Sequence, residues 1–367
     1  MILSKQLWIP EPQLVRTADG LNRVVARVAG QDVFFESSAE LTPKVEALLC
    51  AFLLPAMARH KDLTIQAPVS RCLIRNLTDA RATIREWWPD FGGGGIEAAN
   101  QIERPPADAA GLFFTGGVDS TYALHRLKDH VNALIYVEGF DVPPTDTWRL
   151  EAVRRWHRSA SAFCGLPLLT LRTNLRRHRL FRWPAWGLTH VAALAAAAHC
   201  LARHLHTVYV AASDVPPPHG SNPSLDPAWS SEDTTLVNVG AELSRLERVR
   251  AIAGWEASRG RIRVCWENRR GTLNCGRCEK CVRTQLQFLV AGYPEGFVPL
   301  PAPTLARRIR ALPPVPAHLR TQWRSLLEKD TDPARQHAVA DLLERSPTTP
   351  ASKSRWDGWL AGLRRRF

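Results

Sequence analysis

Short apolar runs alternate with longer amphipathic segments between residues 110 and 264, and this alternation constrains the fold more than any other feature. Two consecutive parallel strands need a long crossover connection, which is usually a helix. We therefore expect an α/β fold in which a parallel sheet carries helices on both faces. The expected strands are 111–114, 131–137, 168–171, 207–212 and 261–264, and the expected helices are 119–128, 146–163, 186–205 and 241–253.

Segments with other sequence patterns flank this region. A chain of 367 residues is also longer than one hydrophobic core usually supports. Residues 1–88 contain two short strand-like runs joined by a turn at Gly30-Gln31 and a helical pattern at 45–58, which predicts a separate α+β domain. Residues 89–109 contain four consecutive glycines and then polar sequence, so a linker is expected. After a central domain at 110–298, the Pro- and Arg-rich region 299–367 has helical patterns at 304–310, 317–328, 334–344 and 356–367.

The chain is basic, with 48 Lys and Arg against 35 Asp and Glu and a net charge of +13. A positive surface attracts anions such as nucleotides or an acidic partner protein. Nucleic acid is a less favoured partner, because no arginine–glycine run, zinc-finger pair or aromatic–basic repeat is present. The sequence has neither an apolar run of membrane-spanning length nor a signal-peptide pattern at its start, so a cytoplasmic protein without membrane contact is expected.

The segment Thr115-Gly-Gly-Val-Asp-Ser-Thr121 follows the first expected strand and opens the first expected helix. Two glycines let the backbone turn sharply and bring its amide groups against a ligand. The N-terminus of the helix that follows suits a phosphate group. Ser120 and Thr121 add hydroxyl donors, and Asp119 can cap the helix or help to hold Mg²⁺. The alternative is an ordinary strand–helix turn with a capping Asp.

Four of the eight cysteines lie within 17 residues, as Cys265, Cys275, Cys278 and Cys281. Four thiolates around one ion form the closed tetrahedral site of a structural Zn²⁺, which is the favoured interpretation. A redox pair is an alternative, since the last three cysteines form two Cys-x-x-Cys motifs. An iron–sulfur cluster is a further alternative.

Thr115-Gly-Gly-Val-Asp-Ser120 resembles the Ser-Gly-Gly-x-Asp-Ser loop of the PP-loop (N-type) ATP pyrophosphatases, with Thr115 keeping the hydroxyl of the usual Ser. These enzymes split ATP between the α and β phosphates and transfer AMP to a carbonyl or carboxyl oxygen. The resemblance implies an adenine-nucleotide α-hydrolase-like fold that uses ATP and Mg²⁺. It also implies that the nucleotide is bound by seven loop residues, Thr115, Gly116, Gly117, Val118, Asp119, Ser120 and Thr121.

The loop followed by the cysteine cluster is similar to the 7-cyano-7-deazaguanine synthases, over about residues 110 to 295. Those enzymes adenylate 7-carboxy-7-deazaguanine, add ammonia, and dehydrate the amide to a nitrile. The chain departs from them in its two flanking regions and in having Arg245 where the family usually has a lysine; arginine can clamp a phosphate but does not act as a base. The resemblance gives Asp119, Ser120 and Arg245 catalytic roles.

These departures suggest a relative of the synthases rather than a synthase. Such relatives occur in antiviral defence gene clusters, where the resemblance implies joining a deazaguanine carboxylate to a protein amine or to ammonia, with the reaction ending at an amide. A sulfur transferase acting on RNA or a base, and a non-catalytic nucleotide-binding subunit of a defence complex, are the alternatives. The flanking regions are expected either to dock an acidic acceptor protein or to cover sheet edges and build a homodimer.

Polar residues near the ends of the third and fourth expected strands are the candidates for binding a carboxylated, purine-like substrate. Their position follows from the rule that ligands bind beyond the carboxyl ends of parallel strands. The long polar loop 216–231 adds to them, because a loop of that length in a compact domain often has a function. The candidates are Asn174, Arg176, Ser213, His219, Ser221 and Asp226. Trp183, Trp186 and His190 are their neighbours; an indole there could stack on a planar base, and core packing explains the tryptophans at least as well.

Overall fold

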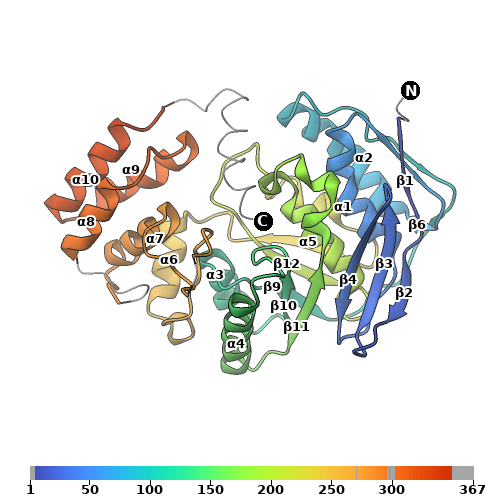
Figure 1. Cartoon of the computed structure of the whole chain (residues 1–367), viewed down its shortest axis with the longest axis horizontal. Coiled ribbons are helices and arrows are strands. Elements are labelled where there is room, and N and C mark those ends of the chain that lie inside the picture. Colours follow the sequence, from blue (N-terminus) through green and yellow to red (C-terminus); the bar gives the residue numbers. More distant parts are fainter. Residues whose placement is uncertain (1–4, 270, 296, 298–301, 349–367) are drawn as a thin grey trace. The chain divides into compact units, whose positions relative to one another are not determined.

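The computed structural model describes residues 5–269, 271–295, 297 and 302–348 (Figure 1). The chain divides into two compact units. The first contains the described residues up to 113 together with 127–141 and 166–241, and the second contains 114–126, 142–165 and the described residues from 242 onward.

An eight-stranded sheet forms the centre of the first unit. Its first five strands are parallel, and they are β13 (Thr235–Val239), β12 (Thr207–Ala211), β9 (Ala110–Phe113), β10 (Ala133–Glu138) and β11 (Leu168–Thr173), in spatial order. Three antiparallel strands continue the sheet, β4 (Gln31–Ser37), β3 (Asn22–Val28) and β2 (Gln13–Arg16). The prediction of an α/β fold with a parallel sheet is confirmed.

The order of the five parallel strands reverses at β9, the first of them along the chain. β10 and then β11 lie on one side of β9, whereas β12 and then β13 lie on the other. This is the arrangement of a doubly wound sheet, in which ligands bind outside the strand ends at the reversal point. β10 is buried along its whole length, as expected for a central parallel strand that is covered on both faces.

The fifth parallel strand is β13, and the expected strand at 261–264 does not form. That segment makes one backbone hydrogen bond to the loop after β9, from Arg263 N to Gly116 O at 2.9 Å. The Asn274 side chain bonds two more backbone groups of this segment, accepting from Val264 N at 3.0 Å and donating to Ile262 O at 2.8 Å. A side chain therefore takes the place that a neighbouring strand would have.

Residues 1–88 differ from the expected separate domain, because β2–β4 extend the main sheet. β4 pairs with β11, and buried Glu36 of β4 forms ion pairs with Arg23 of β3 and Arg172 of β11. α1 (Val45–Met57) contributes to the same hydrophobic core as α5 (Trp186–Cys200), and Thr42 N donates to Cys200 O at 2.9 Å. One core thus spans sequence on both sides of the expected boundary.

The glycine run 92–95 is packed in place, although the sequence predicted a linker. Gly92 N donates to Met57 O at 3.0 Å, and Gly94 N donates to Lys61 O at 2.8 Å. The next residues form β7 (Ile96–Ala98), which pairs with β5 (Asp62–Ile65); β5 also pairs with β1 (Gln6–Ile9). A second small sheet joins β6 (Val69–Ser70) to β8 (Gln101–Ile102), and α2 (Arg71–Trp87) follows β6.

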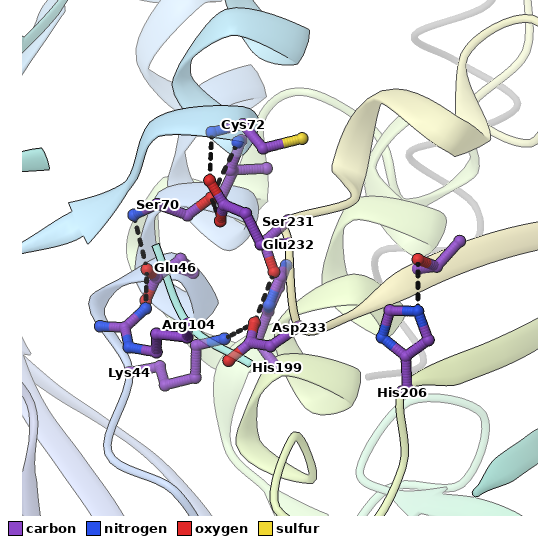
Figure 2. A network of polar contacts seen from close by, with 12 residues as sticks. Lys44, Glu46, Ser70, Cys72, Arg104, His199, His206, Ser231, Glu232 and Asp233 are labelled. Carbon is purple, nitrogen blue, oxygen red and sulfur yellow. Dashed lines mark hydrogen bonds and ion pairs between the residues drawn. The ribbon is translucent and has the colours of Figure 1, made fainter. Parts of the chain in front are cut away.

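A buried ionic network anchors the C-terminal end of the loop 216–231 (Figure 2). Lys44 forms an ion pair with Asp233, whose carboxylate also accepts from Ser231 Oγ at 2.7 Å. Glu232 accepts from Ser70 Oγ at 2.5 Å and from Cys72 N at 2.7 Å. Figure 2 also shows Glu46 between Arg104 and the Ser70 amide. These contacts fix the loop to the first turns of α1 and α2.

The second unit has no strand among its described residues. Its longer helices are α3 (Val118–Leu127), α4 (Thr147–Cys164), α6 (Arg245–Ala253), α7 (Glu279–Val290), α8 (Ala302–Arg310), α9 (Arg320–Lys329) and α10 (Pro333–Glu344). The last three agree closely with the helical patterns read from the sequence, and they share one core with parts of α6 and α7. The expected helix at 356–367 lies outside the described residues. No helix among the described residues is long and apolar enough to cross a membrane.

Candidate functional site

The loop after β9 contains one position where only glycine fits. Gly116 has φ +71°, and a Cβ atom there would lie 1.4 Å from Cη2 of Trp156. The Trp156 indole is itself held by parallel stacking on Phe114, with ring centroids 5.7 Å apart. Gly117 differs, because a Cβ atom there would come no closer than 3.7 Å to another atom. Packing thus explains the first glycine, and the second leaves open space beside the backbone.

Hydroxyl groups gather at the start of α3. The Oγ atoms of Thr115 and Ser120 are 3.3 Å apart, and Ser120 Oγ also donates to Gly117 O at 3.2 Å. The side-chain hydroxyl of Thr121 is buried and has no hydrogen-bond partner among the described residues. The first amide groups of any helix lack partners within it, and together with the helix dipole they favour an anion. The loop therefore offers several donors in a small space.

Two arginines of α6 hold the carboxylate of Asp119. Arg245 Nη1 donates to Oδ2 at 2.5 Å, and Arg248 Nη1 donates to Oδ1 at 2.9 Å. Both arginine side chains are almost fully buried, at 5% and 1% exposure. Their spacing of three residues places them on one helix face, and a capping box between Ser244 and Glu247 fixes the start of that helix. Asp119 is thus a counter-ion for two buried cations.

The electrostatics around Asp119 are dominated by positive charge. Burial raises the pKa of the Asp119 carboxyl, but the charges of Arg245, Arg248 and Lys280 outweigh it and lower the pKa below its usual value. Burial also lowers the pKa of Arg245. Three cations therefore stabilise the ionised carboxylate of Asp119. Both carboxylate oxygens already accept from a guanidinium, so this arrangement does not fit Asp119 as a ligand of Mg²⁺.

Arg248 and Lys280 are site residues that sequence reasoning missed. Arg248 had a local signal, since it lies three residues after Arg245 on a predicted helix. Lys280 lies between Cys278 and Cys281, in a segment whose residue spacing indicates only a metal-binding motif. Its proximity to Asp119 depends on how the cysteine segment folds back, which no local pattern encodes.

The four clustered cysteines come together as one group. Their sulfur atoms all lie within 4.8 Å of one another, and those of Cys265 and Cys278 are 4.0 Å apart. Tetrahedral zinc with Zn–S bonds of about 2.3 Å requires sulfur atoms about 3.8 Å apart. The Sγ atom of Cys275 accepts from the amides of Arg277 and Cys278 at 3.4 and 3.2 Å. The cluster is compatible with Zn²⁺ in both its donor set and its spacing.

Burial separates this cluster from a reactive thiol site. Cys265, Cys278 and Cys281 are buried, and Cys275 is partly buried. Cys265, Cys278 and Cys281 also belong to the same core as Val118 of α3 and Val249 of α6. A metal held here would fix the chain around the start of α7, which contains Lys280. The cluster is therefore placed to support the site around Asp119.

In the first unit, the structure brings two of the six substrate candidates next to an aromatic group. The guanidinium of Arg176 lies 4.8 Å from the Trp186 ring and donates to Phe140 O. Burial lowers its pKa to about 10. His190 lies 6.4 Å from Trp186 and 5.2 Å from His219, as measured between ring centroids. A cation and aromatic rings thus share one region at the start of α5.

Ser221 and Asp226 meet in the long loop but bond to one another and to the protein. The buried Asp226 carboxylate accepts from Asn222 N at 2.9 Å, Asn238 Nδ2 at 2.6 Å and Ser221 Oγ at 3.3 Å. Burial is the main cause that raises its pKa to about 6. This cluster ties the loop to Asn238 of β13, so both residues have a structural use that the sequence did not indicate.

The remaining two candidates contact nearby backbone. The Asn174 amide accepts from Phe34 N at 3.0 Å and donates to Asp32 O at 2.9 Å, which ties the end of β11 to β4. Ser213 Oγ accepts from Val215 N at 3.3 Å. All six substrate candidates belong to the first unit, whereas residues 115–121 and the cysteines belong to the second.

Comparison with known proteins gives no further constraint: no family model, curated protein or solved structure matches the chain.

Proposed function

We propose that this protein is an ATP-dependent ligase that activates a carboxylate as an acyl-adenylate and transfers the acyl group to an amine. The observation that supports this most is the loop Thr115–Thr121, with Asp119 bonded to Arg245 and Arg248. Its hydroxyl groups, helix N-terminus and neighbouring cations suit a polyphosphate. The resemblance to the PP-loop ATP pyrophosphatases supplies the reaction type.

The strand order of the first unit supports the same proposal. Residue 114 follows β9 directly, and β9 is the strand at which the order of the parallel sheet reverses. Loops that leave a doubly wound sheet at this point commonly bind nucleotides. An adenine-nucleotide α-hydrolase-like fold is the finer assignment that we propose on this basis.

The proposed reaction has two steps. A carboxylate oxygen attacks the α-phosphorus of ATP, the bond from that phosphorus to the bridging oxygen breaks, and pyrophosphate leaves with the bonding electron pair. The amine then attacks the acyl carbon, AMP leaves, and the proton lost by the amine nitrogen passes to water. AMP is a far better leaving group than hydroxide, so the protein mainly has to position two reactants and neutralise charge.

The chain's own residues take simple roles in this scheme. Ser120 and the amides at the start of α3 bind the departing pyrophosphate, and Arg245 and Lys280 neutralise the negative charge that develops on it. Mg²⁺ supplies further neutralisation when it is bound, and it would enter with the nucleotide rather than on Asp119. Zn²⁺ at the four cysteines has a structural role, because a closed site of four thiolates has no open position for a substrate.

The proposed substrate is 7-carboxy-7-deazaguanine or a similar carboxylated purine, and the proposed acceptor is a protein amine or ammonia. Arg176 is the candidate for the substrate carboxylate, and the Trp186 ring beside it offers a flat surface to a purine. A sulfur transferase is less favoured, because it needs a reactive thiol and three of the four clustered cysteines are buried.

Pyrophosphate release tests the proposal. The protein is incubated with ATP, 7-carboxy-7-deazaguanine and candidate amines, pyrophosphate is measured, and the products are identified by mass spectrometry. Ser120→Ala should abolish release while the protein remains folded. Asp119→Ala is a poorer test, because it would remove a carboxylate that neutralises two buried arginines and could unfold the protein. ATP binding without carboxylate-dependent pyrophosphate release would identify a nucleotide-binding subunit, and a thiolated product would identify a sulfur transferase.

A further inference from the structure

The first unit contains a basic pocket far along the sequence from the loop 115–121. It is a cavity of about 680 Å³, and its walls come from β1, the β3–β4 turn, the end of α1 and the short helix at 179–182. Five cations line it, Arg27, Arg59, Lys61, Arg179 and Arg182. These residues come from three separate stretches of sequence, so the pocket was not visible as a charge run.

The residues that line this pocket carry positive charge and no negative charge. Arg27 forms an ion pair with Asp32 at 3.0 Å, but both side chains are more than half exposed and such pairs contribute little. Arg59 Nη1 donates to the backbone oxygens of Pro55 and Trp183, at 2.9 and 2.6 Å. Carbonyl oxygens orient a guanidinium without neutralising it.

Two of these arginines are close enough to repel one another. Burial is the first cause that lowers the pKa of Arg59, and the charge of Arg179 is the second. Arg179 is held near Arg59 by hydrogen bonds to Ala29 O and from its own amide to Gln31 Oε1. Holding like charges together costs free energy, and an anion bound between them would recover it.

Two residues beside the pocket have positive φ angles. Ala29 lines the pocket, and with Gly30 it forms the two-residue turn of the β3–β4 hairpin, a type of turn that requires positive φ at both positions. His60, between Arg59 and Lys61, has φ +54°, and His is among the residue types enriched in this conformation.

An exposed aromatic residue, Trp8, is also among the residues that line the pocket. Along β1 the side chains of Leu7 and Ile9 are buried, so the strand alternation turns Trp8 outward, where it is 57% exposed. Exposed aromatic rings beside guanidinium groups are the elements with which proteins bind nucleotides in single strands, by stacking and by charge. The cavity volume lies within the usual range for small-ligand sites.

We propose that this pocket binds a nucleotide, with its phosphate between the arginines and its base stacked on Trp8. The nucleotide is either free or part of a single-stranded nucleic acid. Guanidinium groups bind phosphate through paired hydrogen bonds, which suits a pocket with four arginines. An acidic peptide would use the cations but leave the indole without a partner. The site is independent of the proposed ligase activity.

Fluorescence anisotropy with a labelled ten-nucleotide oligouridylate tests this in the full-length protein. The variants are Arg182→Glu and Trp8→Ala, and Arg16→Glu on the exposed strand β2 is the matched charge control. Arg182→Glu and Trp8→Ala should each weaken binding at least tenfold, whereas Arg16→Glu should change it less than twofold. Binding should weaken as salt rises. Ser120→Ala should leave the affinity for oligouridylate unchanged, and Trp8→Ala should leave pyrophosphate release unchanged. The nucleotide pocket and the proposed ligase activity can therefore be contradicted independently.

Competition separates the sources of the nucleotide. Displacement by UMP at similar nucleotide concentration indicates a free nucleotide, and displacement only by unlabelled oligouridylate indicates a strand; either supports the proposal. Equal loss of affinity in Arg182→Glu and Arg16→Glu would show general charge attraction and overturn it. So would displacement by decaglutamate as effective as by oligouridylate, or by inorganic phosphate as effective as by UMP.

Discussion

The carboxylate of Asp119 lies 2.5 Å from Nη1 of Arg245, so a residue of the glycine loop and a residue 126 positions later form one ion pair. This contact joins α3 to α6 within the second unit. It also gives the buried Arg245 guanidinium a defined position. The consequences of changing either partner follow from the burial of the pair.

Arg245→Lys should lower pyrophosphate release by about 10²–10³-fold, the usual cost of removing one donor to developing charge. Lysine keeps the positive charge but lacks the planar guanidinium group with its several N–H donors, and its ammonium group cannot bond both Asp119 and a phosphate. Steady-state pyrophosphate assays measure the effect. Arg250→Lys, at an exposed position on the same helix, is the control and should retain the wild-type rate. An unchanged rate in Arg245→Lys would remove this residue from the proposed mechanism.

Alanine substitutions at the two loop glycines should differ in their effects on stability and on activity. Gly116→Ala should destabilise the protein by about 2–4 kcal/mol, because its Cβ atom collides with Trp156 and its φ is positive. Gly117→Ala meets only ordinary contacts, so its stability should change by less than about 1 kcal/mol. If the open space at Gly117 admits a phosphate, this second variant should still lose most pyrophosphate release. Chemical denaturation and activity assays distinguish the two effects, and an active Gly117→Ala would argue against close backbone approach.

Local patterns predicted the parts of the structure that depend on neighbouring residues. The loop 115–121, the cysteine spacing and the three C-terminal helices each depend on a short stretch of sequence. β13 also had a local signal, since Thr235, Val237 and Val239 are β-branched residues at alternate positions, but the preceding long loop hid it.

Long-range pairing explains most of what the sequence did not predict. β4 joins the main sheet through its contact with β11, more than 130 residues later in the chain. The glycine run at 92–95 looked like a linker because the groups that accept its amides, Met57 O, Lys61 O and the Asp62 carboxylate, lie more than 30 residues earlier in the chain. The basic pocket likewise depends on segments that meet only in the folded chain. Glycine content and charge totals carry no information on such partners.

Metal removal should unfold the second unit around the cysteines. Cys278→Ser, or treatment with a strong chelator, should release one zinc per chain and lower the unfolding temperature, because metal binding at a structural site contributes directly to folding. Elemental analysis and thermal denaturation measure both effects. Cys164→Ser, which changes a cysteine outside the cluster, is the control and should keep the metal. A content of about four irons per chain would contradict zinc and favour an iron–sulfur protein.

Acid should destabilise the first unit through His199, which is fully buried on α5. Its Nε2 donates to Trp229 O at 3.0 Å, and its Nδ1 has no hydrogen-bond partner among the described residues. Burial, followed by the charge of Lys44, lowers the pKa of His199 to about 3. An unfolded histidine has a pKa of about 6.5, so between these values the unfolded state binds the extra proton. The contribution to stability is therefore complete above pH 6.5 and is lost as pH falls.

His199→Gln tests this linkage, since glutamine keeps a donor for Trp229 O and does not titrate. Between pH 7 and pH 5, the free energy of unfolding of wild type should fall by about 2 kcal/mol more than that of the variant. Urea denaturation at several pH values gives both curves, and His130→Gln, at an exposed position of the same unit, should follow wild type. Parallel curves for His199→Gln and wild type would mean that this imidazole takes up a proton in the folded protein. The ionic network around Lys44 and Asp233 would then have to rearrange to hold the second charge.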